Sequence, residues 1–256
     1  MHRQALRHLR SADPVLARII DRVGPCRLRA DTSGSHFDAV IRSIVYQQLS
    51  GSAAFTIFTR FRDLYGGRTP TPEELLATPD ETLRGVGLSR QKIAYMRDLA
   101  DRVVRADVPI HALHELDDEA VVAALTRVKG VGEWTAQMFL LFRLGRPNVL
   151  PVLDLGVRKA IQRAYGMRKL PSLERVRKIG AAWSPYCSVA VWYLWRSLEV
   201  DGLSGTPPEK RQSGGAAAKR GTKRPARSRA AAASRSTRAR GTAAKSRSAR
   251  GRRRAR

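Results

Sequence analysis

The chain has 256 residues and a formal net charge of +26, and its two cysteines, Cys26 and Cys187, are too few for a four-thiolate iron–sulfur or zinc site. No apolar run approaches the roughly 20 residues of a membrane-spanning helix, and the N-terminal MHRQALRHLRSADP lacks the apolar segment of a signal peptide. Composition therefore predicts an intracellular protein with two free thiols and no membrane partner. The charge favours a polyanion such as DNA or RNA as partner.

The positive charge is concentrated at the C-terminus. Residues 204–256 hold 18 Lys and Arg against one acid, Glu209, a formal charge of +17, while residues 1–203 carry +9. Residues 216–256 contain no aromatic residue and no Leu, Ile, Val or Met, so they cannot bury enough apolar surface to order themselves. We expect 204–256 to be a disordered tail that binds DNA non-specifically, similar in composition to the tails of linker histones. A dispensable, solubilising extension remains the alternative.

Residues 1–203 read as helices almost throughout. Apolar residues recur at spacings of three and four in 37–66, 73–87, 89–106 and 117–128, and no period-two alternation is sustained. Helix starts are expected at Pro72, Asp117 and Ser172, and helix ends at Gly66, Gly87, Gly145 and Gly166. The pattern predicts an all-α domain of about ten short helices.

The stretch LTRVKGVGEWTAQMF (125–139) predicts a helical hairpin. One helix ends near Val128, residues 129–132 reverse the chain, and a second helix runs from about Trp134 to Leu144. Two glycines and the free N–H groups of the second helix could grip a DNA phosphate without reading sequence, and Lys129 adds a positive charge. From the spacing alone, an ordinary turn with glycine caps is an equal alternative.

The hairpin resembles that of the helix–hairpin–helix DNA glycosylases, the endonuclease III superfamily. Their second hallmark, a Gly/Pro-rich loop ending in an Asp, matches RPNVLPVLDLGVRKAI with Asp154. Within that superfamily the chain is most similar to the DNA-3-methyladenine glycosylase II family, through HFDAVIRSIVYQQLSG (36–51), GLSRQKIAYMRDLA (87–100) and WSPYCSVAVWYLW (183–195). The resemblance implies a glycosylase domain over 1–203, with two helical lobes and a cleft between them. Residues 35–160 would form the core lobe with the hairpin at 125–144, and 1–34 with 161–203 the second lobe.

The resemblance assigns the chemistry to Asp154. Cleavage of an N-glycosidic bond develops positive charge on the sugar, which a fixed carboxylate stabilises; taken alone, Asp154 would be read as a helix N-cap. Trp134 stands where strand-cleaving relatives carry a nucleophilic lysine, which implies hydrolysis without strand cleavage. The implied base pocket comprises Trp134, Met138, Leu155 and Trp195. For Trp195 and Trp183, plain core packing stays open.

The resemblance also implies the DNA contacts. Gln48 matches the wedge that fills the gap left by an extruded base, with polar surface at a helix end as the alternative. The hairpin residues Lys129, Gly130, Val131 and Gly132 would hold the backbone. A Na⁺ or K⁺ ion could bind main-chain oxygens of Thr126, Val128 and Val131, while no cofactor is required. His111 and His114 are expected at the surface rather than in a metal site.

The sequence thus predicts a monomeric, monofunctional DNA glycosylase that excises alkylated bases of the 3-methyladenine type from double-stranded DNA, a hydrolase of base-excision repair associated with DNA. Two alternatives stay open. One is a non-catalytic, basic DNA-binding protein of the nucleoid type, and the other is a bifunctional glycosylase with lyase activity. The exact range of damaged bases is undetermined by the sequence.

Overall fold

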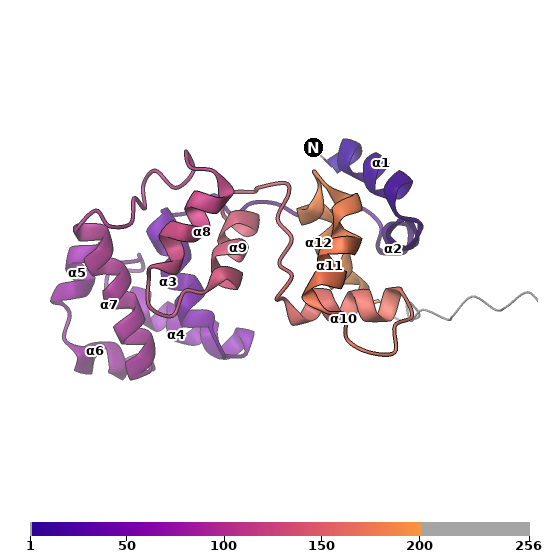
Figure 1. The fold of residues 1–256 in the computed structure, drawn as a ribbon. Coiled ribbons are helices and arrows are strands. Elements are labelled where there is room, and N and C mark those ends of the chain that lie inside the picture. Colours follow the sequence, from indigo (N-terminus) through magenta and orange to yellow (C-terminus); the bar gives the residue numbers. More distant parts are fainter. Residues whose placement is uncertain (1, 201–256) are drawn as a thin grey trace, which may run out of the picture. The chain divides into compact units, whose positions relative to one another are not determined.

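The structure is a computed structural model and describes residues 2–200. Within this range the chain forms twelve α-helices, one 3₁₀ helix and no strand (Figure 1), which confirms the all-α prediction. The predicted tail at 204–256 lies outside the described residues. The helices are α1 His2–Ala12, α2 Pro14–Val23, α3 His36–Tyr46, α4 Gly51–Asp63, α5 Pro72–Ala77, α6 Asp80–Gly85, α7 Arg90–Val104, α8 Asp118–Thr126, α9 Glu133–Phe142, α10 Leu155–Ala164, α11 Leu173–Gly180, η1 Ala181–Trp183 and α12 Cys187–Ser197.

Local sequence accounts for most helix boundaries. Pro72 opens α5, and Asp117 and Ser172 cap α8 and α11 through their side chains, as predicted. The four glycines expected after helices all have positive φ, between 62° and 102°, where a side chain would be strained: Gly66, Gly87, Gly145 and Gly166. The stretch 73–87 divides into two helices because Pro79 stands at the N-cap of α6.

The helices pack in two groups. In the first, α7 packs against α3, α5 and α6, α8 packs against α9, and α3 contacts α4 and α9. In the second, α12 packs against α1, α2 and α10, so the N-terminal helices lie with the C-terminal ones (Figure 1). The boundary expected at residue 160 falls inside α10, a helix whose buried residues pack with α12.

A buried carboxylate ties the second group together. Asp13 caps α2 by accepting from the backbone N–H groups of Val15 and Leu16. Its other oxygen accepts from the indole N–H of Trp183 at 2.8 Å and from the hydroxyl of Tyr165. Four donors therefore satisfy this nearly inaccessible carboxyl group. Trp183 is fully buried, so for this residue core packing is the correct interpretation.

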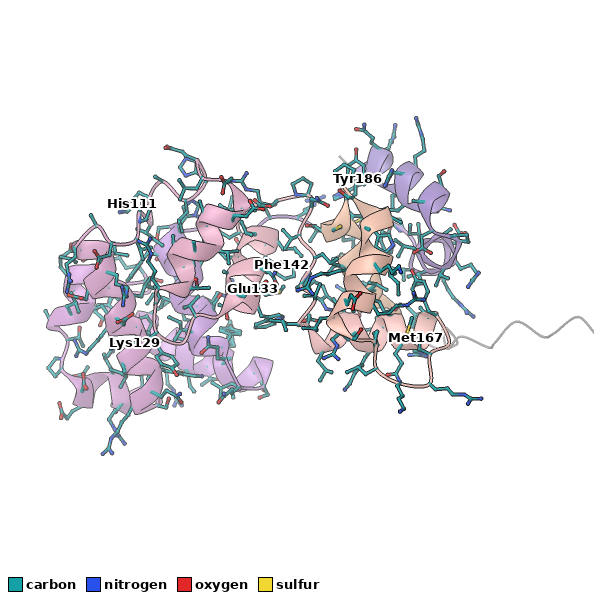
Figure 2. All side chains as sticks on the ribbon, in the orientation of Figure 1. His111, Lys129, Glu133, Phe142, Met167 and Tyr186 are labelled. Atoms are coloured by element: carbon teal, nitrogen blue, oxygen red, sulfur yellow. The ribbon has the colours of Figure 1, made fainter. Side chains whose placement is uncertain are left out.

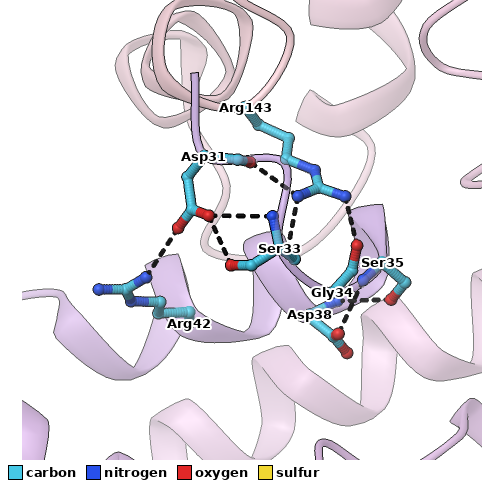
Figure 3. Close-up of polar contacts among 7 residues, drawn as sticks. All are labelled: Asp31, Ser33, Gly34, Ser35, Asp38, Arg42 and Arg143. Carbon is cyan, nitrogen blue, oxygen red and sulfur yellow. Dashed lines mark hydrogen bonds and ion pairs between the residues drawn. The ribbon is translucent and has the colours of Figure 1, made fainter. Parts of the chain in front are cut away.

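Arg143, just after α9, fixes the segment that leads into α3 (Figure 3). Its guanidinium donates to the backbone oxygens of Asp31 at 2.7 Å, Ser33 at 2.6 Å and Gly34 at 2.6 Å. Its Nε–H donates to Nδ1 of His36 at 3.0 Å. One side chain thus holds the connection between α2 and α3 against the end of α9.

No helix among residues 2–200 combines the length and apolar character needed to cross a membrane. Cys26 and Cys187 are both free thiols, as predicted. Burial raises the pKa of Cys187 to about 11, which leaves it protonated and unreactive at neutral pH.

Candidate active site

A groove with a cavity volume of about 1450 Å³ brings together half of the site residues singled out from the sequence. It is lined mainly by side chains of α3, α7 and α9, together with Asp154 and Trp195 from the loop before α10 and from α12. The predicted residues that line it are Gln48, Gly130, Trp134, Met138, Asp154 and Trp195.

Asp154 is held in one orientation by three N–H donors. It is the N-cap of α10 and accepts from Val157 N–H on Oδ1 at 2.7 Å. The indole N–H of Trp195 also donates to Oδ1, at 2.9 Å, and that of Trp134 donates to Oδ2, at 2.7 Å. A carboxylate has about four acceptor positions, so one position on Oδ2 stays open. The N-cap role and a chemical role are therefore compatible in this residue.

The two indoles have a role that sequence reasoning missed. The resemblance places Trp134 in the base pocket, and its exposed fraction of 43% leaves a ring face available for stacking on a base. Its N–H, however, also donates to Asp154, 20 residues later in the sequence, and so orients that carboxylate. Trp195 can approach Asp154 because Gly156 has no side chain: a Cβ there would lie 3.0 to 3.2 Å from Asp154 Oδ1 and the Trp195 ring. No sequence pattern specifies this arrangement.

A third aromatic side chain, Phe142, joins Trp134 and Trp195 beside Asp154, and the three form an aromatic wall of the groove. Phe142 stacks on Trp195, with ring centroids 5.7 Å apart and planes 18° from parallel. Trp134, Met138 and Phe142 recur every four residues and so share one face of α9; Figure 2 labels Glu133 and Phe142 at the two ends of that helix. This spacing of four residues is visible in the sequence and could have identified Phe142 as a member of the same helix face.

Leu155 takes a different place from the other predicted pocket residues. It is the first residue of α10, is 52% exposed, and is not among the residues that line the groove. Leu153 on the other side of Asp154 is also exposed. Asp154 thus stands between two exposed leucines in the sequence.

The hairpin consists of a helix, a turn and a second helix, as predicted, but the helix ends next to the turn differ slightly from the expected ones. The helix α8 ends at Thr126, two residues before the expected end, because its last turn tightens: Val128 N–H donates to Leu125 O. The second helix, α9, starts at Glu133. Its N-cap, Gly132, supplies no side-chain acceptor, so its first N–H groups stay available to an anion.

The two hairpin glycines serve different purposes. Gly130 has a φ of +76°, and a Cβ there would lie 2.1 to 2.6 Å from ring atoms of Tyr95. Gly132 has an ordinary φ of −91°, and a Cβ there would meet nothing within 4 Å. Gly130 is therefore required by the fold, and only Gly132 leaves room for a close approach from outside.

The other hairpin residues divide between core and surface. The side chain of Val131 is buried. The side chain of Lys129 is 71% exposed, and its ammonium lies 3.7 Å from Asp98 of α7 (its position is marked in Figure 2). Thr126 turns its hydroxyl back to Val122 O in α8, and Val128 O accepts from Val131 N–H.

Gln48 lies in the turn between α3 and α4, exposed and with a left-handed φ of +57°. Further groove residues not anticipated from the sequence lie beside it: Tyr46 and Phe58 meet edge to face at 6.2 Å, and Arg42 lies over the Tyr46 ring at 5.4 Å. This side of the groove is aromatic and basic.

His111 and His114 are exposed, as expected; His111 is labelled in Figure 2. The ring of His114 lies 5.6 Å from that of His36 between centroids, and its Nε2 lies 3.7 Å from Glu115 Oε1. Across residues 2–200, no three His, Cys, Asp or Glu side chains are arranged to hold a metal ion.

Comparison with known proteins identifies the family of the chain. Residues 41–185 match the HhH-GPD superfamily of base excision DNA repair proteins. The chain is 33% identical to DNA-3-methyladenine glycosylase 1 of Schizosaccharomyces pombe over 196 residues, which covers 75% of this chain and 86% of that protein. Among solved structures, S. pombe 3-methyladenine DNA glycosylase in complex with abasic DNA superposes with a TM-score of 0.70 at 31% identity, over 77% of this chain and 98% of that one.

A DNA-3-methyladenine glycosidase from Bacillus halodurans superposes with a TM-score of 0.69 at 35% identity, over 75% of this chain and 88% of that one. The family match covers the hairpin and Asp154, whereas Trp195 lies beyond its C-terminal end. The chain belongs to the HhH-GPD superfamily of base excision DNA repair proteins.

Proposed function

We propose that the protein is a monofunctional DNA glycosylase that hydrolyses the N-glycosidic bond of alkylated bases, with Asp154 as its catalytic carboxylate. The observation that carries the proposal is the pair of indole N–H groups that hold Asp154 at the groove. Relatives named as 3-methyladenine glycosylases over most of the chain support the same activity.

The geometry of Asp154 suits stabilisation of a cationic sugar. Its three N–H donors hold both carboxylate oxygens in fixed positions at the groove. The open position on Oδ2 can face the developing positive charge or orient the attacking water. Because the carboxylate is already fixed, it needs no reorganisation as the bond breaks.

The residues near Asp154 support hydrolysis without strand cleavage. Lys92 is the one lysine among the described residues that line it, and its ammonium donates to the backbone oxygen of Val45 at 2.5 Å. The α9 side chain that binds Asp154 is Trp134, whose indole cannot form a Schiff base.

The aromatic wall supports a positively charged base as substrate. Trp134 offers an exposed ring, and Phe142 and Trp195 form a stacked pair at the same groove. Such faces attract cations, and 3-methyladenine or 7-methylguanine is cationic when part of DNA. A cationic base also leaves readily, so no acid is needed to protonate it.

The decisive experiment compares base release from methylated duplex DNA by the wild type and Asp154→Asn. Free base and strand breaks are scored separately. We expect the wild type to release 3-methyladenine or 7-methylguanine without strand breaks, and Asp154→Asn to bind the DNA but release no base. A borohydride-trapped protein–DNA adduct would replace the proposal by a bifunctional lyase. Absence of release by the wild type would leave the non-catalytic DNA-binding alternative.

The DNA contacts form the second part of the proposal. The N–H groups at Gly132 and the start of α9 would hold a phosphate, Lys129 would add charge, and Gln48 would enter the duplex. The basic tail at 204–256 would add a non-specific tether.

A Na⁺ or K⁺ ion held by the backbone oxygens of Thr126, Val128 and Val131 also belongs to the proposal. Carbonyl oxygens suit such ions, and Val128 O keeps a free lone pair beside its one hydrogen bond. Comparing DNA affinity in sodium chloride and in tetramethylammonium chloride at equal ionic strength tests for this ion. Equal affinity in the two salts would argue against it.

A further inference from the structure

One face of α7 carries polar side chains that reach both of the loops assigned to DNA. Lys92, Tyr95 and Asp98 recur every three residues and therefore lie along the same side of the helix. Lys92 reaches the end of α3, while Tyr95 and Asp98 reach the hairpin.

At one end of this face, Lys92 caps α3. Its ammonium donates to Val45 O at 2.5 Å, in the last turn of that helix, where carbonyl groups lack intrahelical partners and the helix dipole favours a cation. Lys92 is half-buried, and this burial lowers its pKa. The ammonium thus fixes the point at which the chain leaves α3.

Immediately after this point the chain turns through two glutamines. Gln47 donates its side-chain N–H to Gly130 O at 2.9 Å, in the hairpin. Gln48 follows with a φ of +57°, a conformation that residues other than glycine rarely adopt. The exposed side chain of Gln48 therefore projects from a turn that is anchored just before it, at α3 and at the hairpin.

At the other end of the face, α7 holds the hairpin itself. Asp98 accepts from Lys129 N–H at 2.8 Å and is paired with Arg102 at 2.8 Å. The ring of Tyr95 occupies the space that a side chain on residue 130 would need. The hairpin and the α3–α4 turn therefore rest on one helix and are joined to each other by Gln47.

We infer that Lys92 and Gln47 are positioning residues that set Gln48 at a fixed place relative to the hairpin. The hairpin can then bind the DNA backbone while Gln48 enters the duplex at a fixed distance from it. This inference rests on the proposed function, in which Gln48 fills the gap left by an extruded base. Both side chains line the groove, but their polar ends are bound to protein groups, Lys92 to Val45 O and Gln47 to Gly130 O. We therefore expect their effect on the reaction to come through base extrusion.

The test measures single-turnover release of 7-methylguanine by Gln47→Ala and Lys92→Met from two duplexes. In one duplex the 7-methylguanine is paired with cytosine, and in the other it lies in a three-nucleotide bubble, already unpaired. We expect the rate of release from the paired duplex to fall about tenfold or more, because displacing a group such as Gln48 from its working position commonly lowers a rate by this factor. The rate of release from the bubble should fall less than about threefold, because its base is already unpaired.

Two further variants control for charge and for folding. Arg84→Met removes an exposed positive charge of α6 outside the groove and should release base from both duplexes at the wild-type rate. Lys92→Arg keeps a cation at the cap and should recover most of the loss seen in Lys92→Met. If Lys92→Met fails to fold by circular dichroism, Gln47→Ala decides, since it alters a turn rather than the half-buried cap of a helix. Equal losses on both duplexes, or no loss on either, would overturn the inference.

A second readout separates this inference from the proposed function. A duplex with 2-aminopurine beside an abasic analogue reports unstacking by its fluorescence and requires no base release. A rise in fluorescence with the wild type that is absent with Gln47→Ala supports the inference. It does so even if the wild type releases no 7-methylguanine, a result that would defeat the proposed function but not the inference. No fluorescence change with the wild type would overturn the inference.

Discussion

At the scale of single residues, the site depends on how one carboxylate is held. Asp154 receives two indole N–H groups from helices far apart in sequence, α9 and α12. Each indole therefore combines a polar contact to the carboxylate with an aromatic surface on the groove. These two contributions can be separated by replacing the indole with a ring that has no N–H.

Trp134→Phe keeps an aromatic ring at the groove and removes the donor to Oδ2 of Asp154. We expect kcat to fall about 10- to 100-fold, because a carboxylate that can turn loses its fixed relation to the sugar, while KM changes little. Steady-state kinetics on methylated DNA measures both. The matched control is Trp192→Phe, the same change at a buried residue of α12 that does not line the groove. Similar losses of kcat in the two variants would contradict the orienting role of Trp134.

At the scale of elements, the hairpin is shaped by its contact with α7 as well as by its own sequence. Its two glycines look equivalent in the sequence Lys-Gly-Val-Gly. Tertiary contacts separate them, because only Gly130 has a left-handed φ and a ring packed against its Cα. Substitution at the two positions should therefore affect different properties.

Gly130→Ala should lower the free energy of unfolding by about 2 kcal/mol or more, since a left-handed alanine is strained and its methyl group would overlap the Tyr95 ring. Urea unfolding monitored by circular dichroism gives this value. Gly132→Ala is the paired variant: it should unfold like the wild type but bind DNA more weakly, because its methyl group would point toward the bound phosphate. Wild-type stability in Gly130→Ala would show that the loop relaxes around the new side chain.

At the scale of the whole molecule, stability should respond to pH through the contact between the start of α3 and the end of α9. His36 Nδ1 accepts from Arg143 Nε–H, which requires a neutral imidazole. Burial, followed by the positive charge of Arg143 and the neighbouring His114 and His111, lowers the pKa of His36 below its ordinary value of 6.5. A lowered histidine pKa means that this contribution to stability is present above about pH 6.5 and is lost as the pH falls through the folded-state pKa.

His36→Asn places a non-titrating amide oxygen near the position of Nδ1. Unfolding free energies measured from pH 8 to pH 5.5 should fall more steeply for the wild type than for this variant, because only the wild type loses the acceptor on protonation. Other titrating groups contribute equally to both proteins, so the difference between the two curves isolates His36. Parallel curves would rule out this residue as the source.

The C-terminal tail belongs to the same scale, because its charge adds to that of the folded domain. Deleting residues 204–256 removes a formal charge of +17, and we expect weaker non-specific DNA binding with a shallower salt dependence, by about 0.9 in slope for each DNA phosphate that the tail would otherwise neutralise. Binding titrations at several salt concentrations measure this slope. Single-turnover base release at saturating enzyme should persist, and its loss would refute the tether role.

The sequence by itself determined the helical class, most helix starts and ends, and the family. These features are local: apolar spacing, capping residues and turn glycines act over a few residues, as at Pro72, Ser172 and Gly87. The resemblance carried by residues 125–136 and Asp154 likewise depends on short motifs in a fixed order.

Only the tertiary structure decided how the site is assembled. The donation of Trp134 and Trp195 to Asp154, the stacking of Phe142 on Trp195, and the place of Leu155 outside the groove all depend on helices distant in sequence. A side chain's partner across such a distance is set by how whole helices pack, and packing distributes its constraints over the entire core. The sequence therefore identified the carboxylate, and the fold determined what holds it.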